Sequence, residues 1–165
     1  MSTWMKSFVA LWLAAAPSIA RAQNQFPPVY VYSEEDELEH IQCQISYVRA
    51  IASVQAGLRY NRITVATRAD YIGNRAIAAY INLNVIRSTI AGRPTGHCIV
   101  NVSLSLRTMT AINDPVTGVR MMPRIEYCEQ SSLMDWNISQ IQDEINRALT
   151  GFLNDCLLDY TRARA

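Results

Sequence analysis

The sequence lacks the motifs by which common enzyme classes hold a nucleophile, a phosphate or a catalytic zinc. It contains no G-x-S-x-G, no P-loop, no H-E-x-x-H and no S-x-x-K. It has one lysine, Lys6, and two histidines, His40 and His97. We therefore predict that the protein is not an enzyme, and we rank a hydrolase or thiol enzyme with an unrecognised site third among its functions.

The sequence also lacks a basic stretch. Its 15 Lys and Arg residues are nearly balanced by 14 Asp and Glu residues. Even the local cluster at Arg120 and Arg124 is mixed with Glu126 and Glu129. Nucleic-acid binding depends on clustered positive charge. We therefore predict no nucleic-acid partner.

Long hydrophobic runs are scarce, and the main one lies at the N-terminus. Residues 8–16 form an apolar run of nine residues, whereas a spanning helix needs about 20. Lys6 precedes this run, Pro17 ends it, and Ala20-Arg21-Ala22 matches a signal-peptidase site. We predict that residues 1–22 are a cleaved signal peptide; an uncleaved anchor is the alternative.

Cleavage after Ala22 sets the expectations for the exported chain. Without Lys6 and Arg21, thirteen basic residues face fourteen acidic ones, for a net charge of −1. The remaining length suits one domain, and no later stretch is long enough to span a membrane. We expect a periplasmic or secreted protein with a leader at 23–32, a single domain at 33–161 and a tail at 162–165.

The first part of that chain predicts an extended leader and then a helix. The Pro27-Pro28 pair disfavours helix, so residues 23–32 are interpreted as a flexible tail with a partly docked end, with an edge strand as the alternative. Ser33 and the acidic run after it predict a helix start, and Gly57 predicts its end. Two apolar stripes follow this helix: Leu38, Ile41, Ile45, Val48 and Ala52; and Cys43, Tyr47, Ala50 and Val54.

Alternation of apolar and polar residues predicts four strands in the middle of the chain. They lie near residues 62–72, 76–90, 97–109 and 119–129, and turn residues separate them. Pro123 marks the last strand as an edge strand or a bulged one. The residues expected to point inward are Ile63, Val65, Thr67 and Ala69; Ile77, Ala79, Ile81, Leu83 and Val85; Cys98, Val100, Val102, Leu104 and Leu106; and Val119, Met121, Ile125 and Tyr127.

The C-terminal segment from Asn137 to about Tyr160 has apolar residues at helical spacing. The predicted order is therefore helix, four-stranded antiparallel meander, C-terminal helix. The economical packing is an α+β fold, a two-layer sandwich with the helices on one face of the sheet.

Four cysteines in an exported chain favour two disulfides, and four allow three pairings. A bulge at Pro123 would turn Cys128 to the inner face of its strand. The preferred pairing is then Cys98–Cys128 with Cys43–Cys156. In the alternative pairings, each helix cysteine bonds a strand cysteine.

Each histidine has a cysteine near it, which raises the question of a metal or thiol site. His97 and Cys98 are adjacent in a predicted strand and point to opposite faces, so they chelate poorly. His40 and Cys43 alone supply two ligands, fewer than a structural zinc site needs. No CxxC is present, and His97 has no acidic neighbour in the sequence. We predict no metal and no cofactor.

Interaction with another protein is the remaining function class. Aromatic side chains with few charges suit protein contacts. The sequence therefore predicts an exported, non-catalytic bacterial envelope protein that acts as a protein-binding or assembly accessory, with a protein partner or a homo-oligomer. A periplasmic small-ligand or metal-binding protein is the alternative. The candidate interaction residues are Phe26, Tyr30, Tyr32, Tyr47 and Tyr80.

Overall fold

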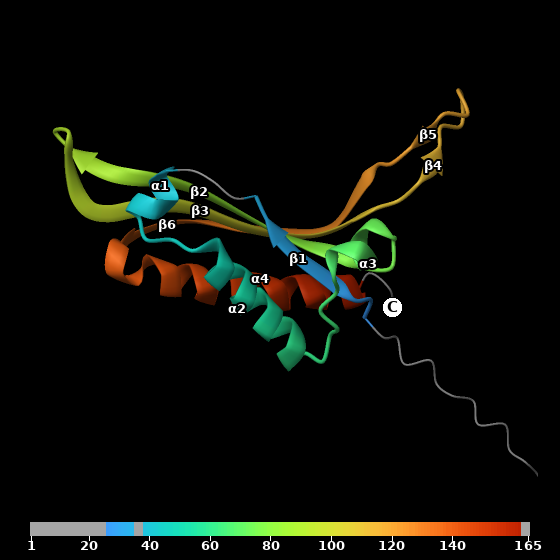
Figure 1. Cartoon of the computed structure of the whole chain (residues 1–165), viewed down its shortest axis with the longest axis horizontal. Coiled ribbons are helices and arrows are strands. Elements are labelled where there is room, and N and C mark those ends of the chain that lie inside the picture. The colour runs from blue at the N-terminus through green and yellow to red at the C-terminus, as the bar shows by residue number, and fades with distance from the viewer. Residues whose placement is uncertain (1–25, 35–37, 163–165) are drawn as a thin grey trace, which may run out of the picture.

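A computed structural model describes residues 26–34 and 38–162. The predicted signal peptide at 1–22 and the first residues of the leader lie outside them. Helices α2 (Tyr47–Tyr60) and α4 (Ile138–Arg162) lie side by side on one face of a curved sheet (Figure 1). The elements are β1 Val29–Ser33, α1 Leu38–Gln42, α2 Tyr47–Tyr60, α3 Arg68–Ile72, β2 Ile77–Ile90, β3 Arg93–Met109, β4 Ile112–Asn113, β5 Arg120–Met121, β6 Arg124–Asn137 and α4 Ile138–Arg162.

The main sheet has four strands in the order β1-β2-β3-β6. Strands β2, β3 and β6 pair antiparallel, whereas β1 pairs parallel with β2. The α+β class is confirmed, and α2 and α4 pack against the sheet, but the sheet is mixed, so the all-antiparallel meander is wrong. The chain reaches β2 from β1 through α1, α2 and α3, and a crossover of this length permits parallel pairing.

The end of the predicted leader is an edge strand, as the alternative interpretation held. Residues Val29 to Ser33 pair with Ile77 to Ile81 of β2. Val29 and Val31 are buried, so alternate side chains of β1 join the core. The preference for a tail is wrong from Val29 onward because this burial holds the segment to the sheet.

The strand predicted near residues 62–72 is also wrong. Only Val65 makes a β-bridge, to Val29. The helix α3 begins after Thr67, whose hydroxyl accepts a hydrogen bond from the backbone N–H of Asp70 at 3.2 Å. The Asp70 carboxylate accepts in return from the backbone N–H of Thr67 at 3.1 Å. This reciprocal capping box favours helix over strand.

The predicted first helix is two helices, α1 and α2, separated by residues 43–46. Gln44 has a φ of 57°, which ends α1, and Ser46 caps the start of α2. Ser33 is the last residue of β1 and caps no helix. On α2 the stripe with Ala50 and Val54 is buried, whereas Val48 of the other stripe is exposed.

The core lies between the inner face of the sheet and the helices. The inward residues predicted for β2 and for β3 are all buried. The predicted C-terminal helix is confirmed as α4. The helix residues that complete the core include Ala50, Val54, Leu58, Ile141, Ile145, Leu149, Leu153 and Cys156.

In the described part of the chain, no helix has the length and apolar character needed to cross a membrane.

The residues of β6 that point inward are not the ones that the alternation predicted. Leu106 pairs with Cys128, but Arg107 pairs with Glu126, so a bulge lies at Tyr127. The bulge shifts the alternation by one residue and places Cys128 against the core. The four residues predicted to point inward, Val119, Met121, Ile125 and Tyr127, are exposed.

Two disulfides connect the sheet to the helical side of the molecule, Cys43–Cys98 and Cys128–Cys156. Their presence is confirmed, but the preferred pairing is wrong, and the structure has one of the alternatives. The reason is the register of the sheet: Cys98 lies across from Trp136, and Cys128 across from Leu106. Cys98 and Leu106, the partner of Cys128, are eight residues apart on β3. The two strand cysteines therefore lie far apart in the sheet, and each faces a different part of the helical side.

Candidate contact surface on the outer face of the sheet

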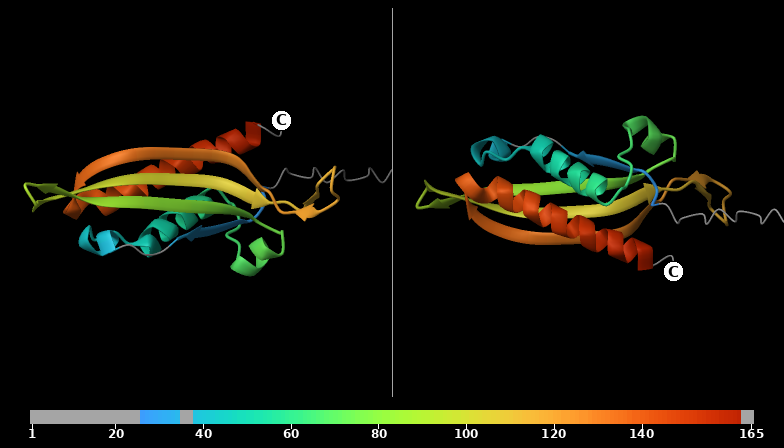
Figure 2. Two further views of the ribbon diagram at one scale, coloured as in Figure 1. Left: turned by 90° about the horizontal axis from the view of Figure 1, so that it is seen from above. Right: turned by 90° about the horizontal axis from the view of Figure 1, so that it is seen from below.

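Helices α2 and α4 leave the outer face of the sheet uncovered (Figure 2). Four tyrosines gather on that side, from three elements. Tyr30 and Tyr32 belong to β1, Tyr80 to β2 and Tyr71 to α3. We call these four tyrosines and Arg107 of β3 the tyrosine cluster.

The period of the strands places three of these rings together. Val29 and Val31 point into the core, so Tyr30 and Tyr32 point outward. Tyr32 and Tyr80 are cross-strand partners whose ring centroids are 5.2 Å apart. Tyr30 stacks on Tyr32 at 5.5 Å. Aromatic pairs at these distances attract one another beyond their buried area.

The fourth ring comes from α3. Its capping box fixes the start of this short helix, and Tyr71 projects from it toward β1. The ring centroid of Tyr71 is 5.8 Å from that of Tyr30 and 6.1 Å from that of Tyr32. The position of α3 therefore completes the cluster.

Arg107 contacts two rings of the cluster, Tyr80 and Tyr32. Its guanidinium carbon lies 3.7 Å from the ring centroid of Tyr80 and 5.2 Å from that of Tyr32. One of its Nη atoms donates to the hydroxyl of Tyr32. Arg107 is only 6% exposed, and among the described residues no carboxylate lies within ion-pair distance of it. Its charge is stabilised by the faces of two rings.

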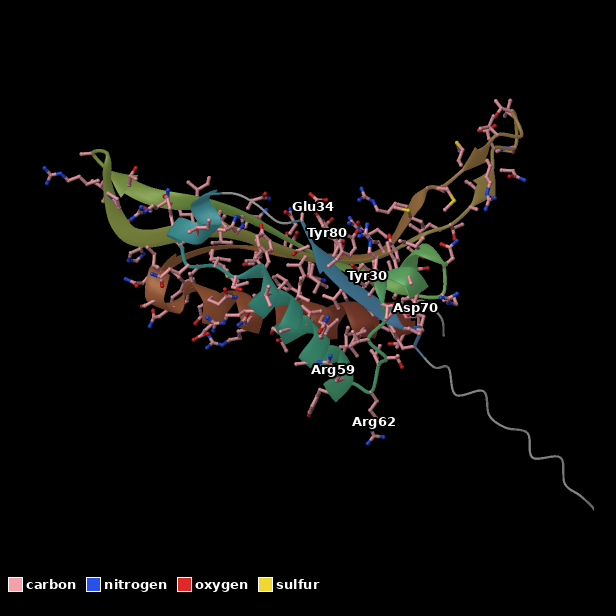
Figure 3. The ribbon with its side chains drawn as sticks, viewed as in Figure 1. Tyr30, Glu34, Arg59, Arg62, Asp70 and Tyr80 are labelled. Carbon is pink, nitrogen blue, oxygen red and sulfur yellow. A yellow bond between two sulfur atoms is a disulfide. The ribbon has the colours of Figure 1, made fainter. Side chains whose placement is uncertain are left out.

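The surroundings of Tyr80 and Tyr71 keep both phenols protonated. Burial raises the pKa of Tyr80, and the nearby carboxylate of Glu34 raises it further. Figure 3 shows Glu34 and Tyr80 together near the end of β1. Burial also raises the pKa of Tyr71, and the positive charge of Arg107 opposes both shifts. Tyr71 Oη and Arg107 Nε are buried with no hydrogen-bond partner in the described part of the chain.

Three of the five predicted interaction residues belong to the cluster, and the other two lie elsewhere. Phe26 packs on Tyr160 of α4, with ring centroids 4.4 Å apart, at the edge of the core. The Tyr47 hydroxyl lies 2.6 Å from Nε2 of His40 and donates to the carbonyl of Leu83 at 3.3 Å. Phe26 and Tyr47 therefore support the fold rather than form this surface.

Neither histidine can pair with a free thiol. All four cysteines are in disulfides. His97 Nδ1 lies 3.2 Å from Oδ1 of Asp135, an acidic neighbour that the sequence spacing did not reveal. His40 is buried, with Nε2 at 2.9 Å from the Leu83 carbonyl. Among the described residues, no three His, Cys, Asp or Glu side chains group as metal ligands.

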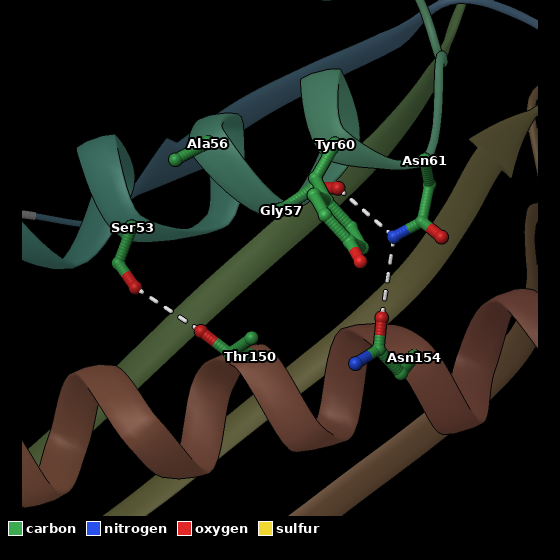
Figure 4. Close-up of a pocket in the computed structure, with 7 residues that line it drawn as sticks. All are labelled: Ser53, Ala56, Gly57, Tyr60, Asn61, Thr150 and Asn154. Carbon is green, nitrogen blue, oxygen red and sulfur yellow. Dashed lines mark hydrogen bonds between the residues drawn. The ribbon is translucent and has the colours of Figure 1, made fainter.

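A separate groove of about 440 Å³ lies between α2 and α4. Gly57 lets the helices approach closely, because a Cβ there would lie 2.8 Å from Cδ2 of Leu153. Figure 4 shows that polar side chains bridge the groove, and the hydroxyls of Ser53 and Thr150 are 3.3 Å apart. It is lined by Ser53, Ala56, Gly57, Tyr60, Asn61, Thr150 and Asn154.

Sequence reasoning missed Arg107 and Tyr71 as members of the site. Arg107 follows the inward residue Leu106, so alternation implies that it points outward, but nothing in the sequence showed that β1 would bring Tyr32 to it. Tyr71 was assigned to a strand, although Thr67 and Asp70 have the spacing of a capping box. No protein-family model matches the chain, and no curated protein matches its sequence.

Proposed function

We propose that this protein is an exported, non-catalytic accessory of a bacterial envelope that binds a partner protein through the tyrosine cluster. The observation that supports this most is the packing of four tyrosines on one another, two of them against Arg107, on the face of the sheet that α2 and α4 leave uncovered. Tyrosine and arginine are enriched in protein interfaces and among the residues that dominate binding energy.

The cluster is also prearranged for contact. Its rings pack on one another, and three of them come from strands. A rigid aromatic surface loses little conformational entropy when a partner binds. Among the described residues Arg107 has no ion-pair partner, although Glu34 lies near Tyr80. A partner that presents a carboxylate at the rim of the cluster would therefore gain favourable electrostatics with the guanidinium.

Two further features support export. Both disulfides join distant parts of the chain, and disulfides persist chiefly in oxidising compartments. The pattern of residues 1–22 matches a signal peptide. We propose the periplasm, or the exterior of the cell, as the location.

Binding of a small ligand in the groove between α2 and α4 is the second candidate. Its volume of about 440 Å³ falls within the range of small-molecule sites. However, the polar side chains that line it are paired with one another: Asn61 Nδ2 donates to Asn154 Oδ1 at 3.2 Å. A ligand would have to replace these hydrogen bonds, so we rank this candidate second.

Catalysis is the third candidate, and it has a direct test. The His97–Asp135 pair is the arrangement that a general base would use. We expect that no reaction catalysed by the protein depends on His97, so His97→Ala should abolish none. A reaction lost in that variant, with its fold unchanged, would make the protein an enzyme.

Photo-crosslinking in the native cell tests the proposed function. A photoreactive phenylalanine replaces Tyr30 in the cluster or, as a control, Arg59. Figure 3 shows Arg59 at the end of α2, away from Tyr80. We expect one identified envelope protein to crosslink from position 30 and not from position 59, and Tyr80→Ser to weaken that crosslink. Equal crosslinking from both positions, or none from position 30, would overturn the proposal.

A further inference from the structure

Residues 110–123 form an arm that projects beyond the end of the sheet (Figure 1). Within it, β4 and β5 pair only through Ile112 with Met121 and Asn113 with Arg120. They form a separate two-stranded sheet. The Thr110 N–H donates to the Pro123 carbonyl at 3.2 Å, which joins the arm to the end of the β3–β6 pair. Beyond that point the arm has only its own two strands, and a two-stranded hairpin has marginal stability in water, so the arm gains from packing on another surface.

The arm is rich in exposed apolar side chains. Val116 near its tip is 90% exposed. A concentration of exposed apolar side chains marks an interaction site. The other exposed apolar residues of the arm and its base are Met109, Ile112, Val119, Met121, Met122 and Ile125.

A second apolar surface lies on the outer face, toward the turn between β2 and β3. Ile86 is 65% exposed and Leu133 is 73% exposed. Ile99 is the cross-strand partner of Ile86, and Asn101, two residues further along β3, is the partner of Leu133. We call Ile86, Ile99 and Leu133 the end patch.

The arm cannot reach the end patch of its own chain. Ile99 and Met109 are ten residues apart on β3, a distance of about 33 Å at 3.3 Å per residue. The arm begins after Met109 and extends away from the turn between β2 and β3 (Figure 1). Contact between the arm and an end patch therefore requires two molecules.

The charges beside the two surfaces are complementary. Arg120 is an exposed residue of the arm. Asp135 is the cross-strand partner of Ile99 at the end patch. Its side chain is exposed, and its Oδ1 lies 3.2 Å from Nδ1 of His97; a carboxylate can accept from a second donor at the same time. Oppositely charged groups beside apolar contacts fix the orientation of two partners.

The other charged residue of the arm argues against insertion into lipid. The Asp114 carboxylate accepts hydrogen bonds from the backbone N–H groups of Val116 at 2.9 Å and Thr117 at 2.6 Å. These bonds lower the pKa of Asp114, so the tip of the arm carries a fixed negative charge. Residues 110–123 also contain no Phe, Tyr or Trp, the aromatic residues that anchor proteins at membrane interfaces.

We propose that the arm of one copy of this protein packs on the end patch of a second copy, with Arg120 of the arm facing Asp135 of the second copy. Two reciprocal contacts of this kind make a symmetric dimer. The inference rests on the proposed function in that it gives the assembly accessory a self-assembly surface, distinct from the tyrosine cluster.

Sedimentation of the purified exported protein over a range of concentrations tests the proposal. Val116→Asp alters the arm, Leu133→Asp alters the end patch, and Val48→Asp is the matched control at an exposed position of α2. We expect the unaltered protein and the control to self-associate. Each test variant should raise the dissociation constant roughly ten-fold or more, as loss of a central apolar contact does.

Two combinations sharpen the test. A mixture of Val116→Asp and Leu133→Asp should regain association, because one variant supplies an intact end patch and the other an intact arm. Arg120→Asp and Asp135→Arg should each weaken association, and the double variant should restore it. A wild-type protein that stays monomeric would overturn the proposal, as would test variants that associate like the control. Binding of anionic phospholipid vesicles that Val116→Asp abolishes, with self-association unchanged, would assign the arm to lipid instead.

The two proposals fail separately. A monomeric wild-type protein leaves the crosslink from position 30 to an envelope protein intact. Absence of that crosslink would overturn the proposed partner contact but would not change whether the protein self-associates in sedimentation.

Discussion

The two faces of one sheet differ in what holds their side chains in place. On the inner face, alternate residues of β2 and β3 are buried against α2 and α4, and both disulfides cross from this face to the helical side. On the outer face, the tyrosine cluster packs at one end, and the end patch is exposed at the other. The same strands thus supply stability on one face and contact surface on the other.

Removal of the disulfides should give the largest effect on stability. The bridges close chain segments with sequence separations of 55 and 28 residues. Closure of such loops is worth about 3–4 kcal/mol each. We expect Cys43→Ser/Cys98→Ser to lower the free energy of unfolding, measured with urea, slightly more than Cys128→Ser/Cys156→Ser. A loss below about 1 kcal/mol in both pairs would contradict this account of the inner face.

The same substitution on opposite faces should separate core from surface. Leu104 of β3 is fully buried on the inner face, whereas Leu133 of β6 is exposed on the outer face. At a protein concentration at which the chain is monomeric, we expect Leu104→Ala to cost about 2–5 kcal/mol of unfolding free energy and Leu133→Ala less than about 0.5 kcal/mol. Urea unfolding measures both, and similar costs would mean that the two faces do not differ in this way.

Within the outer face, the tyrosine cluster should contribute a smaller amount. Tyr80→Leu removes the ring nearest to the buried guanidinium of Arg107. We expect it to lower the free energy of unfolding by about 1 kcal/mol, the usual size of a partly desolvated cation–π contact. Tyr60→Leu is the control, since Tyr60 is 89% exposed on α2, and it should have almost no effect. Equal effects would show that Arg107 gains nothing from the ring.

The smallest effect should be the pH dependence of α3. Hydrogen bonds from Thr67, with the nearby Arg75, lower the pKa of Asp70 from 3.8 to about 2. Because the folded-state pKa is lowered, the stabilisation is complete above the unfolded value and is lost as the pH falls toward about 2. The Thr67 amide resonance, followed by NMR, should shift over this window. In Asp70→Asn that shift should be absent; its persistence would assign it to another group.

Local signals in the sequence predicted part of the fold correctly. The spacing of Ile141, Ile145 and Leu149 identified α4, and strict alternation identified the inner faces of β2 and β3. These signals lie within one element, so sequence alone reveals them.

The rest of the fold depends on contacts between distant segments. Parallel pairing joins Val29 to Ile77, and no local pattern records it. The disulfide pairing follows from the register between β3 and β6. The break in the first helix depends on Gln44 and on the cap at Ser46, which the longer helical pattern obscured.

The candidate site was predicted in the same partial way. Tyr30, Tyr32 and Tyr80 were identified as aromatic residues that could form an interface. Their grouping required the register of β1 on β2, which places Tyr32 beside Tyr80. Arg107 gained its role only through that pairing, and Tyr71 through the short helix α3.

Hydroxyl-radical footprinting is the most direct test of whether the outer face is the contact surface. It compares the tyrosines of the outer face with one tyrosine on the helical side. The protein is oxidised inside intact envelopes and after purification, and each tyrosine is read by mass spectrometry. We predict that Tyr30, Tyr32 and Tyr80 are protected in the envelope relative to the purified protein, whereas Tyr60 on α2 is oxidised equally in both. Equal oxidation of the cluster in both states, or protection of Tyr60 alone, would contradict the assignment of the outer face as the contact surface.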